Sequence, residues 1–468
     1  MKPSLLLAAM AAHLAVTDVV AHSAQWVYRW PALPGEAAPK VEVAPLKYDK
    51  SWAYAVEIDD GPTSTLEVSL PLLARYQWND APPGIAGGAN RPFVGTAAVT
   101  LNSIETSNSA YLTRAQLDEL KIAGWNIVNH SYWHTGNHWD KTQFLKPEDF
   151  RRELFWSQVF FAQQAGDGRG ATHFVYPNGD PYYQPYLTAY GLRSASRVGG
   201  SSPRNLRDPK WNPLDLTRNY LDTGVWVGQT NALAGFPKTP QSGDFVIDFT
   251  HGMNPDAKSE NNKLWVARLD HIARHYGPQG DNSMWVAPTD EIVNYHLAAQ
   301  AARVSMAPGE IKVTLPDDAP ASALTLKISG LSAQATAPTQ ATMIRQGTTV
   351  WLTTPVIGQA GAKLPAPKLK QVYSGPVKDL KWDEPVKIAG VRLMLSSPVA
   401  ADSVFKMEIE TPTGLTESLL SEGATIDKAW GRWLLFPTIP DREAIAARAL
   451  RVSPDPNLRQ MEVWVLAS

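Results

Sequence analysis

Strand-like and helix-like segments alternate along the middle of the chain, from about residue 51 to residue 303. Short apolar runs such as Ala53 to Ile58 and Phe245 to Phe249 predict strands, and longer amphipathic stretches between them predict helices. Each candidate reactive residue falls just after a run that reads as a strand. In parallel α/β barrels the carboxyl ends of the strands meet at one mouth. The alternation therefore predicts an α/β fold, and in a barrel of this class residues distant in sequence could meet at one mouth.

One helix in this region has clear start and stop signals. Thr113 and Gln116 fit a capping box, and Gly124 suits the left-handed position that ends a helix. Pro147 predicts the start of a second helix, which Gly166 would end. Further strands are expected at residues 93–101, 125–128, 172–176 and 285–287, and a further helix at residues 289–303.

Beyond about residue 304 the helical pattern stops and a period of two replaces it. Apolar and polar residues alternate at 391–395, 405–410 and 461–465, which is typical of a β-sandwich. A Pro-rich joint at Leu364 to Pro367 divides this region. We therefore expect an extended lead-in at 22–50, a catalytic domain at 51–303, a small β unit at 304–365 and a sandwich at 366–468.

Composition narrows the class of protein. A chain of 468 residues suits two to three domains, and a net charge of −2 without a basic run argues against nucleic acid as a partner. The absence of cysteine excludes disulfides and thiolate metal ligands. The count of 17 Trp residues favours a carbohydrate ligand, because indole faces stack on sugar rings.

The first 21 residues have the pattern of a secretory signal. Lys2 is followed by a short apolar run from Leu5 to Val16, and Ala21 offers a cleavage point. The run is shorter than the roughly 20 apolar residues that a membrane span requires, so no transmembrane segment is expected. An uncleaved N-terminal helix is the alternative. We expect a secreted or periplasmic bacterial protein.

Two adjacent carboxylates, Asp59 and Asp60, follow the first predicted strand. Their side chains leave the strand end in different directions, so that one can bind a metal ion while the other stays available. Two bare carboxylates this close would repel, and a divalent cation on one of them relieves the conflict. Asp-Asp-Gly-Pro is also ordinary turn chemistry, and the pair alone leaves both readings open.

Three histidines are further candidate site residues. His130 and His134 have the i, i+4 spacing that brings two imidazoles together on a helical turn, and imidazole is a common ligand of zinc and related metals. Surface histidines on a polar loop are the alternative. His251 follows another apolar strand, and the nearby Asp244 and Asp248 are candidates for tuning it. Asp248 lies at an odd offset and would face away.

These segments, taken in order, resemble the polysaccharide deacetylases of carbohydrate esterase family four, which include the nodulation-factor deacetylase. Glu57 to Gly61 is similar to the motif Thr-Phe-Asp-Asp-Gly, His130 to His134 matches His-(Ser/Thr)-x-x-His, and Phe249 to His251 resembles a strand that ends Leu-x-His. The resemblance spans roughly residues 51 to 300. It implies a distorted (β/α) barrel with fewer than eight full units.

The resemblance also implies a role for each residue. Asp59 would be the general base and His251 the general acid. Asp60, His130 and His134 would hold one divalent ion, zinc first among the first-row metals. The backbone amide of Asn178, in the turn after the 172–176 strand, would help to hold the oxyanion.

The sequence departs from this family at two places. The Arg of the third motif, which normally orients the base, aligns near Val175, and Arg218 is our candidate for its replacement. A surface Arg218 with no such role is the alternative. The fourth motif is not recognisable.

The implied activity is metal-dependent hydrolysis of N-acetyl groups on a polysaccharide or oligosaccharide. The same residues could instead cleave O-acetyl esters of a plant or bacterial glycan. A third possibility is a carbohydrate-binding protein that no longer turns over, which the missing Arg and the long β region favour. That region weakly resembles galactose-binding sandwiches. The sequence leaves the oligomeric state open.

Overall fold

The computed structural model describes most of the chain beyond the N-terminal segment. The described residues are 24–32, 34–35, 37–105, 109–134, 147–165, 170–199, 204–223, 228–254, 256, 258–358, 369–395, 407–418, 433–437, 445–453 and 458–466. The predicted signal at 1–21 lies outside them. None of the helices in this described part combines the length and the apolarity needed to cross a membrane.

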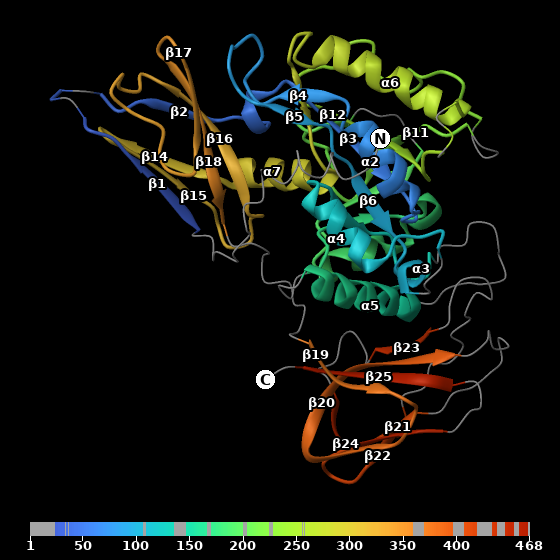
Figure 1. Cartoon of the computed structure of the whole chain (residues 1–468). Coiled ribbons are helices and arrows are strands. Elements are labelled where there is room, and N and C mark those ends of the chain that lie inside the picture. Colours follow the sequence, from blue (N-terminus) through green and yellow to red (C-terminus); the bar gives the residue numbers. More distant parts are fainter. Residues whose placement is uncertain are drawn as a thin grey trace. The chain divides into compact units, whose positions relative to one another are not determined.

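Nine strands of the described residues share one sheet, and seven of them close into a barrel. Strands β3, β6, β11 and β12 of this barrel are labelled in Figure 1. The order around the barrel is β12-β11-β9-β8-β7-β6-β3, and β3 pairs back to β12. The registered neighbours within this ring are parallel. The strands are β3 (Trp52–Ile58), β6 (Thr96–Val99), β7 (Asn126–Asn129), β8 (His173–Val175), β9 (Ser194–Val198), β11 (Leu216–Tyr220) and β12 (Asp244–Thr250). The predicted distorted barrel with fewer than eight units is confirmed.

The barrel strands are buried on both faces, which explains their continuous apolar runs. Every residue of β3, β6, β8 and β12 is buried. Parallel sheets need this double cover, because crossover helices lie over their outer faces. Two short strands, β10 (Arg204–Asn205) and β13 (Met284–Val286), extend the sheet beyond the ring.

The predicted helices are present with small changes at their ends. α4 (Arg114–Ile122) begins directly after Thr113, and Gly124 has the expected left-handed φ of 85°. α5 (Pro147–Ala165) and α7 (Thr289–Ala301) begin where predicted. Helix α6 (Glu260–Tyr276) was not predicted, although the Ser259 side chain caps it by accepting from the backbone amide of Asn262. Short helices α2 (Leu70–Leu73) and α3 (Leu101–Glu105) complete this set.

The chain splits into two compact units. The first comprises Met1–Ala97, Ala115–Val128 and Val198–Lys363. The second comprises Ala98–Arg114, Asn129–Arg197 and Leu364–Ser468.

The first unit also contains two antiparallel sheets outside the barrel. One has the order β17-β18-β16-β2 and the other β1-β15-β14. The strands are β1 (Gln25–Arg29), β2 (Lys40–Val43), β14 (Arg303–Ala307), β15 (Glu310–Thr314), β16 (Ser322–Ser329), β17 (Thr342–Gln346) and β18 (Thr349–Ile357). The lead-in segment thus adds β1 and β2 to sheets built mainly from residues 303–357.

The C-terminal region in the second unit is antiparallel, with the order β19-β25-β20-β24-β21-β22 and β23 against β20. These strands are β19 (Leu369–Gly375), β20 (Leu380–Leu395), β21 (Met407–Glu410), β22 (Thr416–Ser418), β23 (Trp433–Pro437), β24 (Ile445–Val452) and β25 (Leu458–Leu466). The long β20 pairs with β24 through its first half and with β25 through its second, with register shifts between them.

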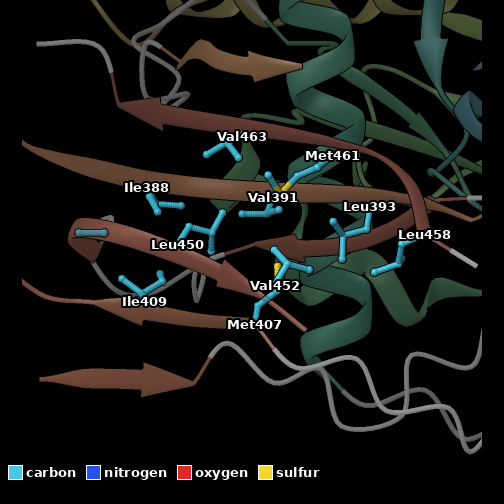
Figure 2. Packing of buried hydrophobic residues seen from close by; sticks show 11 residues of the cluster. Ile388, Val391, Leu393, Met407, Ile409, Leu450, Val452, Leu458, Met461 and Val463 are labelled. Carbon is cyan, nitrogen blue, oxygen red and sulfur yellow. The ribbon is translucent and has the colours of Figure 1, made fainter. Parts of the chain in front are cut away.

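Figure 2 shows the apolar core that these strands enclose. Val391 and Leu393 of β20 and Met461 of β25 pack with Ile409 of β21 and Leu450 of β24. Their neighbours in sequence face the other way, as the period of two predicts.

Candidate metal centre and active site

The candidate residues follow the strands of the barrel as the sequence predicts. Asp59 comes directly after β3, His130 directly after β7 and His251 directly after β12. Because parallel strands present their carboxyl ends at one mouth, these positions share one end of the barrel. Arg218 differs, since it lies within β11.

Asp60, His130 and His134 come together as a possible metal centre. One ligand atom from each of the three lies within 4.8 Å of the others. Two imidazoles and a carboxylate suit zinc and other first-row divalent ions, and three protein ligands are typical of catalytic zinc sites, which keep a further position for water or substrate. The donor chemistry and spacing therefore fit the ion that the resemblance implies.

The ring of His130 has a fixed tautomer that suits metal binding. Its Nδ1 lies 2.8 Å from the carbonyl oxygen of Val175, at the end of β8. A carbonyl can only accept, so Nδ1 must carry the proton and the neutral ring has its lone pair on Nε2. Metal-binding histidines in proteins are usually oriented by such a second contact. His130 is 1% exposed, which holds the ring in this orientation.

The two histidines meet on a loop, so the predicted helical turn is wrong. Their ring centroids lie 4.8 Å apart at an interplanar angle of 75°. The loop is shaped by its own side chains, because Asn129 Oδ1 accepts from the Ser131 amide and Ser131 Oγ from the His134 amide. Such contacts compete with helix formation.

Left-handed backbone marks the same site. Asp60, Ser131 and His134 have φ values of 69°, 66° and 57°. For residues with a side chain this conformation costs on the order of 1–3 kcal/mol each, and it persists only where the surroundings enforce it. The strain thus gathers on two of the three ligands and on the loop that carries the third.

Arg218 holds Asp59 in a two-pronged ion pair. Its Nη1 and Nη2 donate to Oδ1 and Oδ2 of Asp59 at 2.7 and 2.9 Å, and Nη1 also donates to Glu57 at 2.8 Å. The alternative of a surface Arg is wrong, because Arg218 is 2% exposed and its guanidinium lies 3.9 Å from the centre of the Phe249 ring. Arg218 therefore holds the Asp59 carboxylate in place, and its replacement of the missing third-motif Arg stays a prediction.

Charge balance keeps Arg218 ionised. Burial alone would lower the pKa of its guanidinium, but Asp59 and Glu57 outweigh that effect and raise it. Glu57 also accepts from the hydroxyl of Thr289, at the start of α7. Glu57 lies within the first motif but has no role in the sequence-based prediction, and its position inside an apolar strand was the available signal.

His251 is paired with Asp222, which the sequence analysis missed. The Asp222 carboxylate lies 3.1 Å from Nδ1 of His251 and accepts from the His251 amide at 3.2 Å. The hydroxyl of Tyr220 lies 2.9 Å from the same Nδ1. Asp222 follows β11 by two residues, so its position just after a strand was a usable signal.

The two carboxylates predicted to tune His251, Asp244 and Asp248, bind other residues instead. Asp248 accepts from Arg268 and from the Tyr54 hydroxyl, and so faces away from His251 as its offset predicts. Asp244 accepts from Asn205 and from the Gln241 amide. The suggestion that either carboxylate tunes His251 is therefore wrong.

The environment of His251 favours its protonated form. Burial opposes the charge, but the hydrogen bond to Asp222 and the negative charges of Asp59, Asp60 and Asp222 outweigh it and raise the pKa of His251 to about 8. Its side chain is 43% exposed, so a substrate can reach it. A protonated imidazole at neutral pH is suited to donate a proton.

Asn178 lies in the turn that the sequence predicts. Pro177 to Gly179 form a single 3-10 turn after β8, and Asn178 has a left-handed φ of 56°. The contribution of its backbone amide to an oxyanion site stays a prediction.

Comparisons with known proteins give weak similarity. No protein-family model and no curated protein matches the chain. Among solved structures, the Streptococcus pyogenes deacetylase PplD in complex with acetate is 18% identical, with a TM-score of 0.27, over 35% of this chain and 62% of that one. The de-N-acetylase from Aggregatibacter actinomycetemcomitans is 14% identical, with a TM-score of 0.26, over 35% and 68%.

A third solved structure is of another kind. The serine protease of Aeromonas sobria is 13% identical, with a TM-score of 0.20, over 90% of this chain and 89% of that chain. Scores at this level carry no argument about activity. What agrees with the resemblance to polysaccharide deacetylases is the closed parallel barrel and the position of the motifs at its strand ends.

Proposed function

We propose that the protein is a metal-dependent deacetylase that hydrolyses N-acetyl groups of a polysaccharide or oligosaccharide to acetate and a free amine. The observation that carries this proposal is the gathering of Asp60, His130 and His134 into one possible ligand set, with the Arg-held Asp59 adjacent in sequence. Export to the cell exterior or periplasm belongs to the same proposal, because residues 1–21 have the pattern of a secretory signal.

Asp60, His130 and His134 would hold the divalent ion, with zinc first among first-row metals. When bound, the ion supplies Lewis acidity, which polarises an acetyl carbonyl and lowers the pKa of water from about 15.7 toward roughly 7. The carbonyl contact of His130 at Nδ1 keeps the ring turned for this role.

Asp59 would act as the general base. It takes a proton from the attacking water, and Arg218 orients its carboxylate through two hydrogen bonds. A positioned base contributes typically 10²- to 10⁴-fold to the rate. The backbone amide of Asn178 would donate to the oxyanion, and loss of one such donor costs on the order of 3 kcal/mol in the barrier.

His251 would act as the general acid. The amine cannot leave as an anion, so the C–N bond breaks only as a proton reaches nitrogen. His251 is protonated near neutral pH and supplies that proton, and Asp222 holds the imidazolium through Nδ1. The products are acetate and a sugar amine that becomes cationic.

Two other functions remain as alternatives. The same residues would cleave O-acetyl esters, for which the acid matters less because an alkoxide leaves more readily than an amide anion. A carbohydrate-binding protein without turnover is the other, and the filled Arg position weakens it. His251→Ala distinguishes an N-acetyl hydrolase from an O-acetyl hydrolase. In this variant N-acetyl hydrolysis should fall strongly, while O-acetyl hydrolysis changes little.

The experiment that tests the proposal is a screen of acetylated glycans for acetate release, with wild type compared with Asp59→Asn. The variant keeps the shape of the side chain and removes the base, so we expect a loss of about 10²- to 10⁴-fold. Full activity in the variant would refute the base assignment. Absence of acetate release by metal-loaded wild type on N- and O-acetylated glycans alike would favour the binding protein.

A further inference from the structure

The outer face of the C-terminal sandwich carries a buried ion pair. Arg392 on β20 and Glu462 on β25 are register partners, and they are 6% and 8% exposed. Both alternate with core residues, Arg392 with Val391 and Leu393, so their side chains point away from the apolar core of Figure 2. Polar residues on an outer face are normally solvated, so something covers this pair.

Helix α5 of the same unit provides the cover. The Arg392 guanidinium lies 5.6 Å from the centre of the Trp156 ring, and Trp156 is 1% exposed. Gly390, two residues before Arg392, makes room for that ring, since a Cβ there would lie 2.6 Å from its Cζ2. The sandwich and α5 are therefore packed at atomic contact.

Arg392 reaches beyond α5 to the loop that carries the two histidines. Its Nη1 donates to the hydroxyl of Tyr132 at 3.1 Å, while Nε and Nη2 donate to Glu462 at 2.9 and 2.5 Å. In the sequence Tyr132 lies midway between His130 and His134, and its side chain is fully buried. Glu462 thus fixes the guanidinium, and the guanidinium fixes Tyr132.

Other contacts to this loop come from nearby elements. Glu153 of α5 accepts from the Trp133 amide at 3.2 Å, and Ser157 accepts from Asn129 at 2.7 Å. The Asn102 amide donates to the Tyr132 carbonyl at 2.9 Å. Residues 131–134 have no helix or strand hydrogen bonds of their own, so side-chain anchors of this kind set their conformation.

We propose that Arg392, supplied by the C-terminal sandwich, is a positioning residue for the metal centre. It holds Tyr132, and through Tyr132 it keeps His130 and His134 at the spacing that the ion requires. The inference rests on the proposed metal centre, and it gives the sandwich a bracing role in the site. Residues that orient metal ligands typically change affinity by 10- to 100-fold when they are lost.

The test measures Co²⁺ affinity of the metal-free full-length protein, by chelator competition and by the visible absorption of the bound ion. Tyr132→Phe removes one oxygen and keeps the ring, so folding should survive. Arg392→Met removes the guanidinium and keeps much of the apolar stem. We expect each variant to bind Co²⁺ about 10-fold more weakly and to alter the ligand-field bands.

A double-mutant cycle shows whether the two residues act together. If Arg392 works through Tyr132, the double variant should bind Co²⁺ no more weakly than the weaker single variant. Arg451→Met is the matched control, because Arg451 lies on β24 of the same sandwich and pairs at the surface with Glu410. It should bind Co²⁺ like wild type.

The outcomes separate this inference from the proposed function. Wild-type affinity and spectrum in both Tyr132→Phe and Arg392→Met, or fully additive losses in the double variant, would overturn the positioning role while leaving the metal centre intact. Failure of wild type to bind Co²⁺ would overturn the metal centre, and the positioning role with it.

Discussion

The candidate site has two halves that are built in different ways: an acid–base half (Asp59, Arg218 and His251) and a metal half (Asp60, His130 and His134). Asp59, Arg218 and His251 lie on or directly after barrel strands, and buried ion pairs and hydrogen bonds between strands hold them. His130 also lies directly after a barrel strand, but the loop that runs from it to His134 has contacts from α3, α5 and β20 that set its shape. The acid–base half is therefore set by the barrel itself, whereas the metal half depends on elements that pack around it.

The largest effect should be a loss of folding stability when the ion pair of Arg218 in the acid–base half is removed. Arg218→Met leaves Asp59 and Glu57 as two buried carboxylates without their counter-charge. Removal of one partner from such a buried pair typically costs 3–5 kcal/mol, so we expect unfolding in urea at a much lower midpoint. Arg268→Met breaks a similarly buried pair with Asp248 and serves as a control for general destabilisation. An unchanged midpoint for Arg218→Met would contradict the account.

Removal of one metal ligand should break the other half without unfolding the barrel. We expect His134→Ala to lose more Co²⁺ affinity than the roughly 10- to 100-fold typical of an orienting residue, because a direct ligand is gone. The urea midpoint of the metal-free protein should change little, since His134 is only partly buried on a loop. His275→Ala, on an exposed turn of α6, is a control histidine outside the site. Undiminished Co²⁺ binding by His134→Ala would exclude this residue as a ligand.

The pH profile tests the acid–base half more finely. His251 must be protonated to act, so activity should fall as pH rises through its pKa, which is about 8. Asp222→Asn removes the carboxylate that raises this pKa, so the alkaline fall should move toward the ordinary value of about 6.5. A cation on Asp60 lowers the pKa of His251 in wild type and in Asp222→Asn alike. The difference between the alkaline limbs of the two proteins is therefore the quantity to measure. Identical alkaline limbs would show that Asp222 does not tune the acid.

The smallest effect should come from the contact between β20 and α5. Gly390→Ala places a methyl group against the Trp156 ring, and overpacking of this kind costs about 1–3 kcal/mol. We expect a modest fall in the urea midpoint together with weaker Co²⁺ binding, but an unchanged alkaline limb. Gly375→Ala on β19 is the matched control, because the nearest atom to its new methyl group, the Tyr373 hydroxyl, lies 3.1 Å away. If Gly390→Ala changed only the alkaline limb and left Co²⁺ binding unaltered, the metal half would not depend on this contact.

The sequence predicts candidate residues in both halves but few of the contacts that hold them, and the structure shows why. Strand ends can be located from apolar runs, so Asp59 and His251 are placed by local pattern, and a vacant Arg position directs attention to Arg218. Asp222 was missed because no strand is expected from the sequence at residues 216–220, where the structure has β11. Glu57 was passed over because a charged residue inside an apolar strand has meaning only once its partner is known.

The metal loop shows the limit of local patterns. The i, i+4 spacing correctly pairs His130 with His134, but the helical turn is wrong because Asn129 and Ser131 bind the loop amides instead. The link from Arg392 to Tyr132 joins residues 260 positions apart, and no pattern within either segment indicates it. The sequence alternation in the C-terminal region predicts its strands and its core, but not which outer face is covered.

The central claim is that Asp60, His130 and His134 hold one ion on which acetate release depends. The most direct measurement is the rate of acetate release from an N-acetylated oligosaccharide by chelator-stripped protein, titrated back with Zn²⁺. We predict negligible release without metal and full recovery at one equivalent per chain. Full release by the stripped protein, with no response to added metal, would contradict the claim.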